Sequence, residues 1–150
     1  MRPGLFVDSW GWIVLANRNE AGFLQVSEFY REQVASGTSL ITTDYLLDEV
    51  ITFLFAKTAQ QLSVRYLQAL LGSIEGGKIR IERIGPDRFE KAWRMRLKYG
   101  DHRDISFTDF TSFIVMQELS LSNVLTNDRH FEQVNLGFQR VPSSLTGSNS

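Results

Sequence analysis

Short apolar runs alternate with longer segments of helical periodicity along most of the 150 residues, and this alternation restricts the fold more than any other feature of the chain. The apolar runs predict strands at residues 5–7, 39–41, 79–81, 123–125 and 138–141. Apolar residues at every third or fourth position predict helices over 9–16, 22–35, 44–57, 59–73, 86–99 and 108–119. Strands that alternate with helices need crossover connections. The predicted fold is therefore a three-layer α/β/α structure with a mostly parallel central sheet of about five strands.

The length is that of one domain, and we expect a single domain over residues 1–142. Residues 143–150, Ser-Ser-Leu-Thr-Gly-Ser-Asn-Ser, lack an apolar pattern and are expected to form a flexible C-terminal tail. Asp8 interrupts the first apolar run, so no secretory signal is predicted, and no run approaches the length of a membrane span. We expect a cytoplasmic protein that does not contact a membrane.

The chain contains no cysteine, which limits the kinds of site that it can build. Disulfide frameworks, thiolate zinc sites and cysteine nucleophiles are all excluded, so any metal ion must be held by oxygen or histidine. The net charge of −1 gives no sign of a generally basic, nucleic-acid-binding surface. Bound divalent cations would, however, neutralise several carboxylates and leave the remaining surface more basic.

Four acidic residues are expected at one edge of the sheet. Asp8 closes the first strand, Asp128 follows the strand at 123–125, and Glu49 and Asp109 lie near the starts of two helices. Loops and helix N-termini converge at the carboxyl ends of parallel strands. Carboxylates gathered there repel one another by about 1 to 4 kcal/mol per pair, and a cation that binds oxygen ligands, Mg²⁺ or Mn²⁺, relieves that repulsion.

Each of these residues also has a structural interpretation. Asp109 belongs to a capping-box-like pattern with Ser106, Asp8 is able to form a turn or cap a helix, and Asp128 fits an Asx turn. On a helical wheel Asp48 and Glu49 flank the apolar stripe about equally. Periodicity therefore does not choose between them.

The chain resembles the PIN-domain nucleases, which include the VapC-type toxins of toxin–antitoxin pairs. The resemblance rests on four segments in the family's order: Leu-Phe-Val-Asp8-Ser-Trp, Thr-Thr-Asp-Tyr-Leu-Leu-Asp-Glu49-Val, Asp104-Ile-Ser-Phe-Thr-Asp109-Phe and Leu-Thr-Asn-Asp128-Arg-His-Phe. It implies a PIN-like fold and an endoribonuclease that uses Mg²⁺ or Mn²⁺ to cleave single-stranded RNA. The role would be that of a toxin or of an RNA-processing relative.

The resemblance also implies roles for individual residues. The metal-binding and catalytic residues would be Asp8, Glu49, Asp109 and Asp128, with Asp48 as the fallback for Glu49. Supporting roles would fall to a further set of polar residues, namely Ser9, Ser106, Thr126 and, as an accessory ligand, Asp104.

Residues next to the proposed ligands are candidates for RNA binding, namely Arg103, Arg129 and His130; His130 is equally interpretable as a structural histidine. The resemblance further implies a small antitoxin partner and a homodimer. The aromatic residues Trp10, Trp12 and Phe23 either pack in the core or supply an interface. The helix at 86–99 is expected to bury three residues at four-residue spacing, Phe89, Trp93 and Leu97.

Two other classes compete with the nuclease. A metal-dependent phosphohydrolase or receiver domain also places acids at strand ends, but a phosphatase of the haloacid-dehalogenase type has a second aspartate two residues after the first, where this chain has Trp10. A receiver domain has an acidic pair after its first strand, which this chain lacks. The second class is a non-catalytic module that binds RNA or a protein. The repulsion between the clustered acids destabilises the fold, and a module without catalytic activity has no reason to keep it.

Overall fold

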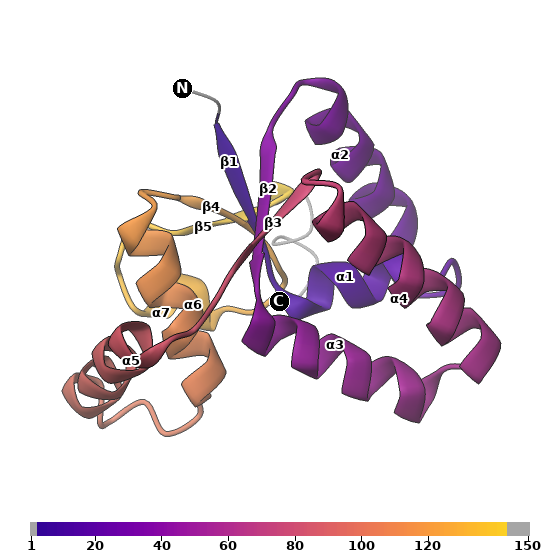
Figure 1. Cartoon of the computed structure of the whole chain (residues 1–150). Helices are drawn as coiled ribbons and strands as arrows, with labels where there is room; N and C mark the ends of the chain where they lie inside the picture. Colours follow the sequence, from indigo (N-terminus) through magenta and orange to yellow (C-terminus); the bar gives the residue numbers. More distant parts are fainter. Residues whose placement is uncertain (1–2, 144–150) are drawn as a thin grey trace.

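A five-stranded, fully parallel sheet forms the centre of the computed structural model, which describes residues 3–143 (Figure 1). The strands are β1 (Gly4–Val7), β2 (Ser39–Thr43), β3 (Ile79–Glu82), β4 (Asn123–Leu125) and β5 (Gln139–Val141). The predicted α/β fold with a parallel sheet is confirmed. The expected flexible tail lies, from residue 144 on, outside the described residues.

The strand order β3-β2-β1-β4-β5 places β1 in the middle of the sheet. Residue Phe6 pairs with Ile41 of β2 on one side and with Val124 of β4 on the other. The chain adds β2 and β3 outward on one side of β1 and then returns to add β4 and β5 on the other. This reversal makes the carboxyl ends of β1 and β4 the topological switch point, where ligands bind in open parallel sheets.

Helices cover both faces of the sheet (Figure 1). One face carries α1 (Ser9–Ala16), α2 (Phe23–Ala35), α3 (Asp44–Lys57) and α4 (Gln60–Glu75), and the other carries α5 (Pro86–Lys98), α6 (Phe107–Glu118) and α7 (His130–Gln133). Alternate residues of β1 serve the two faces: Leu5 and Val7 belong to the core under α1–α4, and Phe6 belongs to the core under α5–α7. A strand buried on both faces must be apolar throughout, as the sequence of β1 is.

The expected helices at 9–16 and 44–57 and the expected strand at 123–125 match the structure, and the other predicted bounds agree with the observed ones to within two residues. The short helix α7 was not predicted, because four residues are too few to show a helical period. Within the described part of the chain, every helix falls short of the length and hydrophobicity that crossing a bilayer requires.

Two expectations about aromatic residues are resolved by burial. Trp12 is 1% exposed and donates a hydrogen bond from Nε1 to Thr42 Oγ1 at 3.1 Å, so it is a core residue. The expectation that α5 buries its apolar stripe is wrong, because Phe89 and Trp93 are each 47% exposed and Leu97 is 62% exposed. The face of α5 that packs inward is instead built on Ala92 and Met95, and Tyr99, directly after the helix, packs against the same core.

Candidate active site

The candidate site lies at the switch point, where β1 and β4 end side by side. The backbone N–H of Asp8 donates to the carbonyl oxygen of Leu125 at 3.2 Å, which continues the pairing of the two strands by one residue. Asp8 is only 5% exposed. Its backbone therefore leaves the sheet at the carboxyl edge while its carboxylate remains inside the protein.

Thr126 connects two of the predicted acidic residues. Its buried hydroxyl donates to Asp8 Oδ2 at 2.7 Å and accepts a hydrogen bond from the backbone N–H of Asp128 at 3.0 Å. One side chain thus fixes the carboxylate that follows β1 and the turn that follows β4. The supporting position expected for Thr126 is beside the acids, and that is where it lies.

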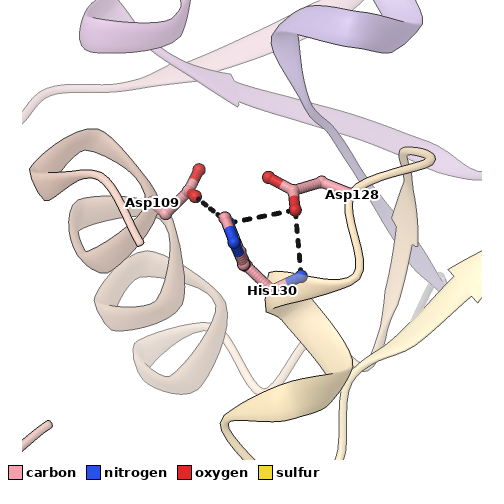
Figure 2. Close-up of side chains that lie close together, drawn as sticks. All are labelled: Asp109, Asp128 and His130. Atoms are coloured by element: carbon pink, nitrogen blue, oxygen red, sulfur yellow. Dashed lines mark hydrogen bonds and ion pairs between the residues drawn. The ribbon is translucent and has the colours of Figure 1, made fainter. Parts of the chain in front are cut away.

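Asp109 is brought to the same place by the first turn of α6. Ser106 caps this helix by accepting the backbone N–H of Asp109 at 3.1 Å, as the capping-box-like pattern predicts. The Asp109 carboxylate does not return to the cap. It is 8% exposed and instead faces the loop after β4 (Figure 2).

His130 stands between three of the acidic side chains. Its Nδ1 lies 3.1 Å from Asp109 Oδ2 and 3.1 Å from Asp128 Oδ1, and its Nε2 lies 3.0 Å from Asp104 Oδ2 (Figure 2 draws the first two). Asp128 Oδ1 also accepts the backbone N–H of His130 at 2.9 Å. Both ring nitrogens face carboxylates, which is the arrangement of a doubly protonated imidazolium.

The pKa values of the acids are raised because the carboxylates are buried and lie close to one another. The pKa of Asp8 is raised to about 7, first by burial and then by the charges of Asp109 and Asp128, and the hydrogen bond from Thr126 opposes this rise. The pKa of Asp109 is raised to about 6, first by burial and then by the charge of Asp128, and the contact with His130 opposes this rise. Carboxylates whose pKa values approach neutrality are typical of functional sites.

Glu49 joins this group from the second turn of α3. Its pKa is raised by burial first, then by the neighbouring Asp48 and by Asp128, and its own charge contributes to the raised pKa of Asp109. Glu49 is an exposed residue that lies within electrostatic range of two other acids of the rim, Asp109 and Asp128.

The pKa of His130 reflects opposing effects. Its partial burial lowers the pKa, but the hydrogen bonds and charges of its acidic partners prevail and the net shift is upward. The same contact lowers the pKa of Asp104, mainly through the hydrogen bond with His130. A protonated His130 and an ionised Asp104 stabilise each other at the outer edge of the site.

The donor set fits a divalent cation. Ligand atoms of Asp109, Asp128 and His130 all lie within 4.8 Å of one another. Carboxylate oxygens together with one imidazole nitrogen suit Mn²⁺, and the carboxylates alone suit Mg²⁺. A cation at this position would take over the neutralising role that the imidazolium of His130 has in its absence.

The remaining predicted residues lie at the margin. Ser9 is the first residue of α1, and its backbone N–H lies close enough to the Asp8 carboxylate to oppose the rise of its pKa. Arg103 is exposed in the loop between α5 and α6, one residue before Asp104, and Arg129 is exposed between Asp128 and His130. Sequence reasoning did not foresee that His130 bridges Asp104, Asp109 and Asp128. The spacing of Asp128 and His130, two residues apart, was the only available signal.

Comparisons with known proteins point to one family. The family model described as "PIN domain" matches residues 5–136. The "23S rRNA-specific endonuclease VapC20" of Mycobacterium tuberculosis is 26% identical over 137 residues, which cover 91% of this chain and 97% of that protein.

Solved structures agree with the sequence comparison. The crystal structure of Mycobacterium tuberculosis VapC20, described as a Sarcin-Ricin loop cleaving toxin, superposes with a TM-score of 0.77 at 26% identity, covering 91% of this chain and 98% of that one. VapBC2 from Rickettsia felis, bound to a DNA fragment from their promoter, gives a TM-score of 0.68 at 12% identity, covering 91% of this chain and 98% of that one. At such low identity the second likeness concerns the fold alone.

Proposed function

This chain belongs to the PIN domain family, and from that premise we propose that it is a divalent-metal-dependent endoribonuclease that cleaves phosphodiester bonds of single-stranded RNA. The observation that carries the proposal is the convergence of Asp8, Glu49, Asp109 and Asp128 at the switch point of the sheet, with the pKa of Asp8 raised to about 7. Two of these acids, Asp8 and Asp109, are buried, and such a cluster destabilises the metal-free protein unless a cation binds to it.

In this proposal Asp8, Glu49, Asp109 and Asp128 hold Mg²⁺ or Mn²⁺. When bound, the cation supplies Lewis-acid stabilisation of the negative charge that develops on the scissile phosphate. Thr126 keeps the Asp8 carboxylate in position through its 2.7 Å hydrogen bond. Ser9 and Ser106 support the site through the backbone of the first turns that they begin, and Asp104 orients His130 from outside.

Cationic side chains around the rim are assigned to the RNA backbone. Arg103 and Arg129 adjoin Asp104 and Asp128 in the sequence and are exposed. If the carboxylates of Asp109 and Asp128 held a cation without the imidazole, His130 would stay beside Asp104 and could face a phosphate. These residues would offset the repulsion between the acidic site and a polyanionic substrate.

We assign this nuclease to the toxin–antitoxin class, with ribosomal RNA as the favoured substrate. The support is the 26% identity to a 23S rRNA-specific endonuclease over nearly the full length of both chains. A small antitoxin protein is the expected partner. The resemblance also implies a homodimer, for which the buried Trp12 is not a suitable surface.

The test is a cleavage assay on labelled single-stranded RNA and on purified ribosomal RNA, with Mn²⁺, Mg²⁺ or a chelator. We expect cleavage only with metal, and loss of cleavage in Asp8→Asn, Asp109→Asn and Glu49→Gln. Asp48→Asn is the matched control, because Asp48 is exposed and adjacent to Glu49. Its cleavage should equal that of the wild type.

Other outcomes would change the assignment. Cleavage that survives in Glu49→Gln but not in Asp48→Asn would assign the metal ligand to Asp48 in place of Glu49. The absence of both cleavage and calorimetric metal binding would support the non-catalytic module. Cleavage that persists in Asp8→Asn would show that the activity comes from a contaminant or from another site.

A further inference from the structure

The peptide unit that joins Val7 to Asp8 is held from two sides. Its N–H, which belongs to Asp8, donates to the carbonyl oxygen of Leu125 at 3.2 Å, and its carbonyl oxygen, which belongs to Val7, accepts the hydroxyl of Thr42 at 3.1 Å. The first bond leads to β4 and the second to β2. Because a peptide unit is planar, these two bonds fix its rotation. They thereby fix the direction in which the Asp8 side chain leaves the backbone.

The side chain of Thr42 extends the contact between β1 and β2 toward the site. The registered pairs of the two strands run from Gly4 to Phe6, so they end one residue before Val7. Thr42 and Val7 are both fully buried. The Val7 carbonyl therefore cannot turn to solvent for another donor, and the Thr42 hydroxyl takes on the task of holding it.

Trp12 determines how the Thr42 hydroxyl is directed. The indole Nε1 of Trp12 lies 3.1 Å from Thr42 Oγ1. An indole N–H only donates and a carbonyl oxygen only accepts. The hydroxyl must therefore accept from Trp12 and give its single proton to Val7. A buried chain of hydrogen bonds in which every group is satisfied is rigid.

Close packing of α1 brings Trp12 within reach of β2. Trp12 follows Gly11, where an added Cβ would lie 3.0 Å from side-chain atoms of Val7 and Leu125 and 3.1 Å from the Leu125 carbonyl oxygen. Only a residue without a side chain lets the first turn of α1 approach the end of the sheet so closely. The other side of Trp12 is held by α4, because the hydroxyl of Tyr66 donates to the Trp12 carbonyl at 2.7 Å.

We propose that Thr42 is a positioning residue of the metal site, which acts on Asp8 through the Val7 carbonyl, and that Trp12 acts on Thr42. The inference rests on the proposed function, because it takes Asp8 as a metal ligand. Thr126 holds the Asp8 carboxylate itself, whereas Thr42 holds the backbone from which that carboxylate projects. A binding site must keep its ligands within about 0.5 Å of the productive geometry, which requires both kinds of support.

The next residue, Thr43, connects the same segment to a second proposed ligand. Its hydroxyl accepts the backbone N–H of Leu46 and caps α3, the helix that carries Glu49. Two successive threonines at the end of β2 thus each support one ligand, Thr42 through a strand and Thr43 through a helix. The end of β2 is therefore a part of the site that contributes no ligand of its own.

The first test is calorimetric titration of the full chain with Mn²⁺, without RNA. Thr42→Val keeps the shape of the side chain and removes both hydrogen bonds, and we expect the dissociation constant of Mn²⁺ to rise about tenfold or more. Thr42→Ser keeps the hydroxyl and should restore an affinity close to that of the wild type. In cleavage assays of Thr42→Val, the Mn²⁺ concentration for half-maximal rate should rise by the same factor, with the KM for RNA unchanged at saturating Mn²⁺.

Tyr66→Phe is the matched control. It also removes a buried hydrogen bond of Trp12, but one that does not lead to the Val7 carbonyl. We expect it to lower the melting temperature and to leave the Mn²⁺ affinity unchanged, which separates positioning from a general loss of stability. Trp12→Phe should weaken Mn²⁺ binding, and adding it to Thr42→Val should weaken binding no further, because both substitutions act on the same carbonyl.

The second test needs neither metal nor RNA. The amide N–H of Asp8 belongs to the peptide unit that Thr42 holds, so its NMR resonance reports on that unit directly. We expect this resonance to move in Thr42→Val and Trp12→Phe and to stay in place in Tyr66→Phe. Trp12→Phe also keeps the proposal testable if Thr42→Val does not fold.

Two results would overturn the proposal: an Mn²⁺ affinity of Thr42→Val equal to that of the wild type, or a loss of affinity in Tyr66→Phe as large as that in Thr42→Val. The second result would reduce the chain of hydrogen bonds to a role in stability. A wild type that binds no Mn²⁺ would instead overturn the proposed function. In that case an unmoved Asp8 resonance in Thr42→Val would still show that Thr42 does not hold this peptide unit.

Discussion

At the scale of single residues, the hydroxyl of Thr126 has two partners that are both buried or partly buried, Asp8 Oδ2 and the backbone N–H of Asp128. Its hydrogen bond to Asp8 joins residues that are 118 positions apart in the sequence. Valine has nearly the same shape as threonine but cannot form either hydrogen bond. Thr126→Val therefore tests the positioning of the site without changing its charge.

We expect Thr126→Val to lower the free energy of unfolding by about 1 to 3 kcal/mol, because two polar groups lose their partner. It should also raise the pKa of Asp8, since the Thr126 hydrogen bond lowers it. Calorimetric titration with Mn²⁺ should then require a higher pH for the same affinity. Thr126→Ser keeps the hydroxyl and should behave like the wild type; equal affinity of the valine variant at every pH would contradict the role.

Ser112 provides a second prediction at this scale. Its hydroxyl is fully buried in α6 and is the single buried side-chain polar atom without a hydrogen-bond partner among the residues 3–143. Ser112→Ala removes an unsatisfied group, so we expect the free energy of unfolding to rise by about 1 kcal/mol in denaturant titrations.

A matched serine makes the comparison specific. Ser63, also buried in a helix, donates from Oγ to the carbonyl of Leu54 at 2.9 Å and so joins α4 to α3. Ser63→Ala should destabilise the protein by about 1 kcal/mol. Equal effects of the two substitutions would show that Ser112 has a partner in solution.

At the scale of elements, the N-terminal caps decide where the helices that carry the site begin. Ser106 caps α6, and Thr43 caps α3 by accepting the backbone N–H of Leu46 at 3.1 Å. Each cap satisfies an N–H that has no partner within the helix. The two caps thereby fix the first turn that carries Asp109 and the turn that precedes Glu49.

We expect Ser106→Ala to lower the free energy of unfolding by about 1 kcal/mol, because the N–H of Asp109 loses its acceptor. Ser106→Asn supplies another good cap and should recover most of that loss. The measurement is chemical denaturation of the metal-free protein. An asparagine variant as unstable as the alanine variant would show that Ser106 acts through something other than the cap.

At the scale of the whole molecule, the acidic site links stability to pH. The pKa of Asp8 in the folded protein is about 7 and that of Asp109 about 6, against an ordinary value of 3.8 for both. The folded state thus binds more protons than the unfolded state between these values, and stability falls as pH rises through this window. The raised pKa of His130 acts in the same direction, because its contribution is present below its ordinary pKa of 6.5 and is lost as pH rises through the folded value.

We therefore expect the melting temperature of the metal-free protein to fall as pH increases from about 6 to above 7. Saturating Mn²⁺ should reduce this dependence, because the cation keeps the carboxylates ionised and offsets their repulsion. Asp8→Asn removes one titrating group and should also flatten the curve. A melting temperature that rises over this interval without metal would contradict the role of the site.

The sequence by itself determined the layers of the fold and the edge on which the acids gather. Apolar runs and helical periodicity are local, so α1 and α3 were predicted to the residue, and the cap at Ser106 was predicted from its near neighbour Asp109. The carboxyl ends of parallel strands meet at one edge whatever their order. The rim position of Asp8 and Asp128 could therefore be predicted before the strand order was known.

Only the tertiary structure decided those features of the site and the surface that depend on contacts between residues far apart in the sequence. Asp48 and Glu49 are equivalent on a helical wheel, and only the docking of α3 brings Glu49 within range of Asp128. The bridge from His130 to Asp104 joins residues 26 positions apart. The stripe of α5 is as apolar as a buried one, but Ala92 and Met95 pack against α6 in its place, so its exposure follows from how α5 meets its neighbours and not from its own period.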